Sequence, residues 1–421
     1  MNVLIIGGGG REHTLCWKLE QSKGCSQLYA APGNAGTASC AINLPIAVTD
    51  FEGIKEAVLA HNIGLVIVGP EEPLVRGLHD YFLADSDLSS IGVIGPQQAA
   101  AMLEGSKAFA KAFMKRHKIP TAGYAEFTAE TATEGEAYLA QSTPPYVLKA
   151  DGLAAGKGVL ILEDLESAKQ ELRAMLLDQK FGSASQKVVI EEFLSGIELS
   201  CFVLTDGKSY LTLPMAKDYK RIGEGDTGLN TGGMGAISPV PFVTEEFKNK
   251  IENQIVKPTI EGLKKDSLPY KGFLFIGLIK VGEEPKVIEY NVRMGDPETE
   301  VVIPRIASDL LELFLAVDQE RLHEMTLDIH PDTAATVMAV SGGYPEGYEK
   351  GKEISGLEGN ELVFHAGTTI QGTQVLTSGG RVLAATSFGK NPTEAVRKSY
   401  ETLSEIHFEG MYYRKDIGFD L

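Results

Sequence analysis

The sequence predicts an α/β and α+β protein of several domains, with an open parallel sheet, then a small antiparallel lobe, then a small strand-rich unit. The chain has 421 residues, of which 43% are hydrophobic, enough for two or three cores. Short apolar runs alternate with helical stretches up to about residue 104, which is the βαβ pattern of a parallel sheet. From about residue 146 closely spaced strands with hairpin signals indicate antiparallel pairing.

The first domain is expected to cover residues 1–104. Its parallel sheet uses the apolar runs at 3–6, 27–30, 65–68 and 92–94. A new helix then begins at Ser106 and ends before Pro120. It carries Lys107 and Lys111 on one face, because residues four apart lie one turn above each other.

The middle region is expected to hold a small antiparallel lobe. Its strands are predicted at 146–150, 159–162, 188–190 and 199–204, with a helix near 165–177. Hairpin signals stand at Asp151-Gly152 and Asp206-Gly207. Residues 326–421 form a further strand-rich unit, closed by a helix at 392–406.

Composition narrows the class of function. A formal net charge of −18 argues against a nucleic-acid or membrane binder, so an anionic substrate would need its own cluster of basic side chains. The four cysteines show no paired or zinc-binding spacing and are expected to be reduced thiols. The N-terminal apolar run is too short for a signal peptide, and no run approaches the ~20 residues of a membrane span. We expect a cytoplasmic protein.

A strand near residue 290 carries the strongest chemical signal. Period-two alternation places Glu289, Asn291 and Arg293 on one face, with Ile288 and the other apolar residues on the opposite face. A carboxylate and an amide oxygen two residues apart suit Mg²⁺, and the arginine suits an anion. The trio predicts metal and phosphoryl chemistry. A strand with a solvated face is the alternative.

The segment 149–158 joins two predicted strands and reads as a phosphate-binding lid. Gly152, Gly156 and Gly158 let backbone amides approach phosphates, with Lys149 at one end and Lys157 among the glycines. The spacing excludes a P-loop, which needs four residues between its glycines and a hydroxyl after the lysine. A long hairpin loop would explain the glycines but not the two lysines.

Two carboxylates follow the strand at 188–190. A strand exit can offer backbone groups to the edge of an adenine, and a carboxylate such as Glu198 can accept from ribose hydroxyls. The Glu191-Glu192 pair would then mark an adenine-binding hinge. Taken alone the pattern is weak, because paired glutamates are usually solvated.

Two glycine-containing regions suggest a sugar phosphate. Residues 7–13 follow a strand and open a helix, but the third glycine of a dinucleotide-binding motif is absent. Amides at that helix start, with Asn34 and Thr37 opposite, could hold a phosphate; tight turns between strand and helix are the alternative. Residues 218–221 and 230–235 combine basic side chains with a flexible backbone that can order over an anion, or form a mobile surface loop.

In this order the segments resemble the phosphoribosylamine–glycine ligase family of the ATP-grasp superfamily. The matching segments are 9–13 (GGREH), 32–38 (PGNAGTA), 69–74 (GPEEPL), 103–107 (LEGSK), 149–158 (KADGLAAGKG), 230–235 (NTGGMG), 289–298 (EYNVRMGDPE) and 413–418 (YRKDIG). The resemblance implies a pre-ATP-grasp domain over 1–104, an ATP-grasp domain over 105–325 with its small lobe at about 124–194, and a C-terminal domain over 326–421.

The resemblance also implies a role for individual residues. ATP would be bound by Lys107, Lys149, Gly152, Gly156, Lys157, Gly158, Glu191, Glu192, Leu194 and Glu198. Mg²⁺ or Mn²⁺ would be bound by Glu289 and Asn291, and the catalytic residues would be Arg293, Lys157 and Asp296. The substrates would be bound by Gly10, Arg11, Asn34, Thr37, Asp218, Lys220, Arg221, Gly232, Gly233, Asp296, Pro297 and Glu298.

Four residues depart from the family pattern, and none of them is a proposed ligand. They are Gln97, Ile197, Leu229 and Met294, of which Leu229 stands where a proline usually stiffens the following loop.

The implied reaction joins glycine to 5-phospho-β-ribosylamine with ATP, through a glycyl phosphate, in purine biosynthesis. The expected partners are therefore small molecules, with no nucleic acid or membrane, and the expected state is a monomer. Another ATP-grasp ligase and a nucleotide-binding regulator without catalysis are the alternatives. The regulator is disfavoured because Glu289, Asn291 and Arg293 are all present.

Overall fold

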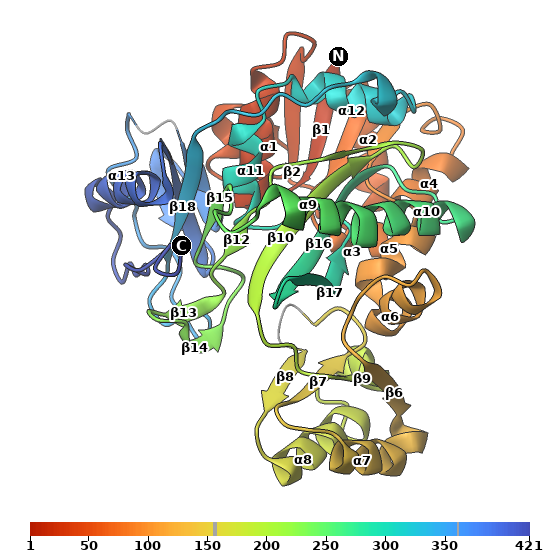
Figure 1. The fold of residues 1–421 in the computed structure, drawn as a ribbon. Helices are drawn as coiled ribbons and strands as arrows, with labels where there is room; N and C mark the ends of the chain where they lie inside the picture. The colour runs from red at the N-terminus through yellow and green to blue at the C-terminus, as the bar shows by residue number, and fades with distance from the viewer. Residues whose placement is uncertain (155–157, 360–361) are drawn as a thin grey trace.

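The computed structural model describes residues 1–154, 158–359 and 362–421. Figure 1 shows an N-terminal sheet with its helices, a central sheet beside it, a small lobe that projects away from both at the bottom of the view, and a C-terminal unit at the left. The predicted fold class is confirmed. Among the described helices, none is long and apolar enough to cross a membrane.

The N-terminal sheet is parallel and has the strand order β3-β2-β1-β4-β5. Its strands are β1 (Asn2–Gly7), β2 (Gln27–Pro32), β3 (Ile42–Asn43), β4 (Ile63–Val68) and β5 (Gly92–Ile94). Its helices are α1 (Gly10–Glu20), α2 (Phe51–Ala60), α3 (Glu71–Val75), α4 (Leu78–Ala84) and α5 (Gln98–Gly105). The four predicted strands are present, because each apolar run is buried on both faces of the sheet.

The small lobe is one antiparallel sheet covered by two helices, with a hydrophobic core of its own. Its elements are β6 (Tyr124–Thr128), α7 (Ala132–Gln141), β7 (Tyr146–Ala150), β8 (Val159–Leu162), α8 (Leu165–Leu176) and β9 (Lys187–Glu191). The chain enters and leaves the lobe side by side, since the Glu192 N–H donates to the Gly123 carbonyl at 2.8 Å. Helix α6 (Lys107–Arg116) precedes it and is capped by the Ser106 hydroxyl.

The central antiparallel sheet has the order β11-β10-β16-β17. Its strands are β10 (Ile197–Thr205), β11 (Tyr210–Thr212), β16 (Gly272–Val281) and β17 (Glu284–Asn291). Four helices flank it: α9 (Glu245–Ile251), α10 (Lys257–Lys265), α11 (Thr299–Arg305) and α12 (Leu310–Asp318). Its buried side chains share two cores with the N-terminal sheet.

Two predictions about these strands are wrong. The strand expected at 199–204 in the small lobe is β10, which pairs with β16 instead. A register shift opposite Gly277 and Leu278 makes Ile288 the extra residue of a bulge, so Val287 and Tyr290 are buried here and Ile288 is only partly buried. Strand β17 therefore ends at Asn291, and Arg293 lies beyond it.

The C-terminal sheet draws strands from two parts of the chain, in the order β12-β15-β18-β22-β19. Strands β12 (Lys217–Asp218) and β15 (Gly235–Ser238) come from the middle region. Strands β18 (Thr333–Val340), β19 (Val363–His365) and β22 (Arg381–Gly389) come from the C-terminal part, as does helix α13 (Pro392–Glu405), which lies near the predicted position. Two hairpins complete the fold: β13 (Arg221–Gly223) with β14 (Thr227–Asn230), and β20 (Thr368–Gln371) with β21 (Gln374–Thr377).

Several single turns connect these elements. Short 3-10 helices span Thr37–Ser39, Ala129–Thr131, Gly182–Gln186 and Leu322–Glu324, and a π-helical segment, Glu252–Val256, joins α9 to α10.

Candidate active site

Arg293 is clamped between two carboxylates of the N-terminal domain. Its guanidinium lies 3.2 Å from Glu71 Oε2 and 2.6 Å from Glu104 Oε1. Glu104 also accepts the Val292 N–H at 2.7 Å. Burial raises the pKa of Glu104 to about 7, although the arginine opposes the shift. Sequence reasoning missed both glutamates as site residues, although they stand inside the motifs GPEEPL and LEGSK.

Glu289 and Asn291 lie at the end of β17. The Asn291 amide oxygen accepts from Arg293 at 3.2 Å, while its amide nitrogen is buried without a hydrogen-bond partner among the described residues. A carboxylate and an amide oxygen at this spacing are hard donors that fit a divalent cation. The described residues contain no group of three or more His, Cys, Asp or Glu that could hold a metal, so such a cation would need further oxygen ligands from water or phosphate.

Three lysines gather where the small lobe meets α6. Lys149 and Lys111 lie 3.1 Å and 3.0 Å from the same Glu191 oxygen. Lys107 donates to the Gly152 carbonyl at 3.3 Å, and burial lowers its pKa while Glu289 opposes the shift. The two predicted phosphate lysines and the predicted metal ligand are thus close enough to influence one another.

The described ends of the predicted lid are fixed to neighbouring elements. The Asp151 carboxylate accepts from the Ser106 hydroxyl at 2.9 Å and from the Ala108 N–H at 2.7 Å, which ties the lid to the start of α6. The Gly158 carbonyl accepts from Ala150 at 2.8 Å. Predicted residues Gly156 and Lys157 lie outside the described residues.

The predicted adenine hinge connects β9 to β10. Glu191 is buried and holds the lysines through its side chain, while the Glu192 carboxylate accepts the Gly123 N–H at 3.2 Å. Leu194 is half-buried and Phe193 is 40% exposed. An exposed aromatic ring beside a strand exit leaves apolar surface for a planar base.

Glu198 and Lys220 form one ion pair at 2.7 Å, although the sequence assigned them to different substrates. The ammonium holds the pKa of Glu198 below its usual range. Lys220 also lies 3.0 Å from Asp218.

Glu298 accepts from the Ser200 hydroxyl at 3.0 Å, and burial together with the Asp218 charge raises the pKa of Glu298 to about 7.

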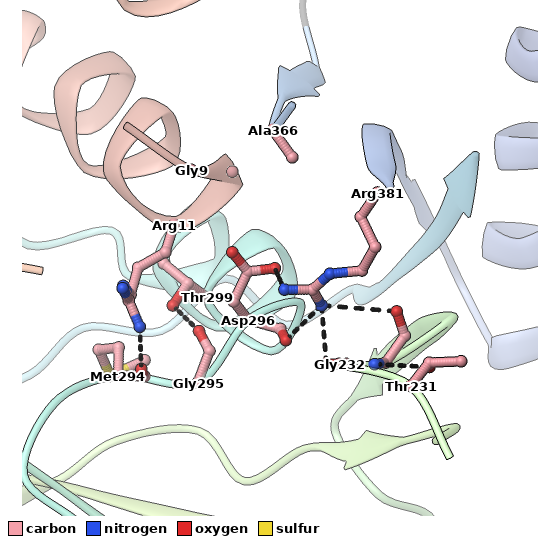
Figure 2. A network of polar contacts seen from close by, with 12 residues as sticks. Gly9, Arg11, Thr231, Gly232, Met294, Gly295, Asp296, Thr299, Ala366 and Arg381 are labelled. Carbon is pink, nitrogen blue, oxygen red and sulfur yellow. Dashed lines mark hydrogen bonds and ion pairs between the residues drawn. The ribbon is translucent and has the colours of Figure 1, made fainter. Parts of the chain in front are cut away.

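Arg381, which sequence reasoning missed, joins three segments of the site. Figure 2 shows its guanidinium donating to the carbonyls of Gly232 and Asp296, each at 2.7 Å. It also pairs with the Asp296 carboxylate at 3.0 Å. Gly233 has a φ of +119°, and a side chain there would strike Pro297 at 2.3 Å. No sequence motif flagged Arg381, because its partners are far away in the chain.

The N-terminal loop approaches the same place (Figure 2). Arg11 donates to the Met294 carbonyl at 3.2 Å. A Cβ on Gly9 would lie 3.3 Å from the Asp296 carboxylate, and one on Gly10 would lie 2.3 Å from Glu300. Both Glu300 carboxylate oxygens are buried without a hydrogen-bond partner in the described part of the chain, and burial raises its pKa well above the usual range.

Asn34 and Thr37 are buried among internal hydrogen bonds. The Asn34 amide donates to the Gly8 and His365 carbonyls at 3.0 Å and 2.6 Å. The Thr37 hydroxyl, fully buried, donates to Asn43 at 2.7 Å. Arg221 donates to the Gly228 carbonyl at 2.8 Å within the β13–β14 hairpin. These side chains hold loops in place.

Three family models match almost the whole chain. They are those of phosphoribosylglycinamide synthetase: the N domain over residues 1–104, the ATP-grasp (A) domain over 105–299 and the C domain over 334–420.

Curated relatives match the full length of the chain. The phosphoribosylamine–glycine ligase of Vibrio vulnificus (strain YJ016) is 47% identical over 427 residues, which cover 100% of this chain and 98% of that protein. The bifunctional purine biosynthetic protein PUR2,5 of Pichia angusta is also 47% identical over 99% of this chain, but the chain spans only 53% of its length.

Solved structures show the same fold. The crystal structure of phosphoribosylamine–glycine ligase from Thermotoga maritima has a TM-score of 0.85 and 36% identity, covering 99% of this chain and 100% of that one. The biotin carboxylase domain of Hydrogenobacter thermophilus 2-oxoglutarate carboxylase has a TM-score of 0.72, covering 98% and 91% of the two chains. Its identity is 16%, so this second likeness concerns the fold alone.

Proposed function

This chain belongs to the phosphoribosylglycinamide synthetase family, and from that membership we infer that it joins glycine to 5-phospho-β-ribosylamine at the expense of ATP. The products are glycinamide ribonucleotide, ADP and phosphate, in purine biosynthesis. A carboxylate is a poor acyl donor, so glycine is first phosphorylated, and the amine then displaces phosphate from glycyl phosphate.

The observation that carries the proposed nucleotide site is that Lys107 and Lys149 lie where the small lobe meets α6, close enough to Glu289 for its charge to act on Lys107. The lysines would bind the ATP phosphates, and the hinge around Phe193 would face the base. Glu289 and Asn291 would hold Mg²⁺ or Mn²⁺. Such a cation would neutralise phosphate oxygens as charge develops on the transferred group.

Arg293 lies beside the proposed metal ligands, where it supplies positive charge and orients Asn291. The clamp by Glu71 and Glu104 fixes its guanidinium, and its hydrogen bond to the Asn291 oxygen orients that amide. A fixed donor costs no reorganisation when charge develops on the phosphoryl group. Arg293 is therefore proposed to stabilise the phosphoryl transfer while it positions Asn291.

Glycine carries an ammonium group that needs carboxylates. Asp218 and Glu298 are close enough that the charge of Asp218 raises the pKa of Glu298, and Lys220 opposes this shift. A cationic ammonium placed there would relieve this repulsion. We therefore place the glycine ammonium near this pair, with its carboxylate directed toward the nucleotide phosphates.

The ribosylamine is proposed to lie at the start of α1. Arg11 and the backbone amides of the helix start offer donors to its phosphate, and Asp296 lies beside Gly9. The attacking amine must lose a proton once its nitrogen bonds to the acyl carbon. The Asp296 carboxylate, held by Arg381, is positioned to accept that proton.

The test is the joint dependence of ADP release on glycine and freshly generated phosphoribosylamine. Glycine labelled with ¹⁸O in its carboxylate should give ¹⁸O-containing phosphate with ADP, because one carboxylate oxygen leaves with the phosphoryl group. Labelled AMP with pyrophosphate would overturn the phosphoryl-transfer route. A preference for another acid or another acceptor in a substrate panel would overturn the substrate assignment.

A further inference from the structure

One buried carboxylate, Glu191, is shared by two buried ammonium groups. Its Oε2 lies 3.0 Å from Lys111 Nζ and 3.1 Å from Lys149 Nζ. The three side chains are only 2%, 7% and 5% exposed for Lys111, Lys149 and Glu191. One negative and two positive charges therefore lie together with little screening by water.

The two lysines are held differently. Lys111 Nζ donates to the Thr121 hydroxyl at 2.8 Å, which in turn donates to the Val287 carbonyl at 2.6 Å. The Lys111 ammonium also lies 5.9 Å from the centre of the Tyr124 ring. Lys111 is thus fixed to the central sheet. Within the described residues, the ion pair with Glu191 is the polar contact that the Lys149 ammonium makes.

This difference matters when an anion arrives. If Lys149 turned from Glu191 to a phosphate and no second cation were present, a buried carboxylate would be left without a counter-ion, which is strongly unfavourable. Lys111 removes that cost, because Glu191 keeps a partner at 3.0 Å after Lys149 has left. The cluster also has one positive charge in excess, which favours an anionic ligand.

We propose that Lys111 is a positioning residue that acts as the standing counter-ion of Glu191 and so releases Lys149 to bind the nucleotide phosphates. The inference rests on the proposed nucleotide site and adds a residue to which no role in the reaction has been assigned. Burial lowers the pKa of Lys111 to about 8, and Glu191 opposes the shift. In most molecules Lys111 is therefore protonated at neutral pH.

The first test replaces Lys111 by methionine, which keeps the stem and removes the charge. In Lys111→Met, Glu191 depends on Lys149 alone, so we expect the Kd for MgADP, measured by calorimetry, and the KM for MgATP to rise about tenfold. The KM for glycine should change less than about twofold. The matched control is Lys115→Met, which removes an exposed lysine one turn further along α6 and should bind MgADP like the wild type.

The second test separates this role from a merely structural one. Glu191→Gln in the Lys111→Met background removes the charge that retains Lys149, so the Kd for MgADP should return to within about threefold of wild type. Lys111→Arg keeps a cation beside Glu191 and should bind MgADP within about threefold of wild type, which keeps the inference testable if Lys111→Met fails to fold.

Each remaining outcome has a defined meaning. Unchanged MgADP affinity in folded Lys111→Met, no recovery in the double variant, or weakened binding in Lys111→Arg would each overturn the role of Lys111. Absence of MgADP binding by the wild-type protein would overturn the proposed nucleotide site itself.

Discussion

At the scale of single residues, the buried charges of the site occur in groups in which one ion meets two of opposite sign. Arg293 lies between Glu71 and Glu104, and Glu191 is shared by two lysines. Removing an outer member leaves the central ion with one partner, whereas removing the central ion leaves two buried charges unpaired. The central residues should therefore be the less tolerant of substitution.

The proposed metal ligands, Glu289 and Asn291, give the first prediction. Glu289→Gln and Asn291→Ala should raise the Mg²⁺ concentration that gives half-maximal activity by about tenfold or more, because each removes a proposed ligand. The melting temperature should change little, since neither side chain fills the core. Mg²⁺ titrations of activity together with thermal melts measure both effects.

Glu284→Gln is the control, because Glu284 lies on the same strand but pairs with Lys250 in solvent. If both ligand variants kept full activity at limiting Mg²⁺, the metal assignment would be wrong.

Glu104 gives a pH-dependent prediction. Its pKa is about 7 in the folded protein and near its ordinary value of 4.5 when unfolded, so the folded state binds more protons between these values. Stability must then fall as pH rises from about 4.5 to 7. Relative to Glu104→Gln, the wild type should lose about 3 kcal/mol of unfolding free energy across that window.

Urea unfolding at pH 5 and pH 8 measures this difference. Glu72→Gln changes an exposed glutamate next to the clamp, and its difference from wild type should not vary in the same way. Parallel pH profiles of the wild type and Glu104→Gln would show that Glu104 ionises normally.

At the scale of elements, local sequence pattern predicted strands well and their partners poorly. Strands β7 and β8 coincide with the predicted ranges, because both ends carry clear turn signals. Strand β10 was assigned to the wrong sheet, because its partner β16 begins far along the chain. The alternation of apolar and polar residues shows which face of a strand is buried, but it does not show which strand pairs with it. Arg381 and the pairing of Lys111 with Glu191 were missed for the same reason.

The closing motif gives a prediction at this scale. Arg414 is fully buried and pairs with Asp226 and Asp416 at 2.7 Å and 2.8 Å, and it donates to the Arg221 carbonyl at 3.1 Å. It therefore anchors the β13–β14 hairpin. Arg414→Ala should destabilise the protein by about 3 kcal/mol or more, because two carboxylates lose their partner.

Hydrogen exchange should also accelerate across residues 221–230 in Arg414→Ala. The control is Arg397→Ala, which removes an exposed ion pair on α13 and should change stability by less than about 0.5 kcal/mol. Unchanged exchange in the hairpin would contradict its anchoring by Arg414.

At the scale of the whole molecule, the small lobe is nearly independent, whereas the other parts share their interiors. The lobe has a separate core, and the chain crosses into it at Gly123 and out at Glu192. The N-terminal and central sheets share two cores. The C-terminal sheet includes β12 and β15, which come from the middle region of the chain (Figure 1).

Replacing residues 124–191 by a two-glycine linker should therefore leave the rest of the protein folded. The deletion removes Glu191, so the same variant should carry Lys111→Met to avoid an unpaired buried ammonium. We expect one cooperative melt and no detectable MgADP binding, because the lobe supplies Lys149. Loss of a cooperative transition would show that the lobe supports the other cores.

Because β12 and β15 come from the middle region, they also determine the order in which the proposed active site can form during synthesis. Strand β15 leaves the ribosome roughly a hundred residues before its partner β18, and at about 5–20 residues per second this leaves one of its edges unpaired for about 5–20 s. Arg381 and Arg414, which fix the loops around Gly232 and Arg221, appear later still. A nascent chain can therefore assemble the proposed nucleotide site early, but the proposed acceptor site becomes ordered only after Arg381 and Arg414 have emerged.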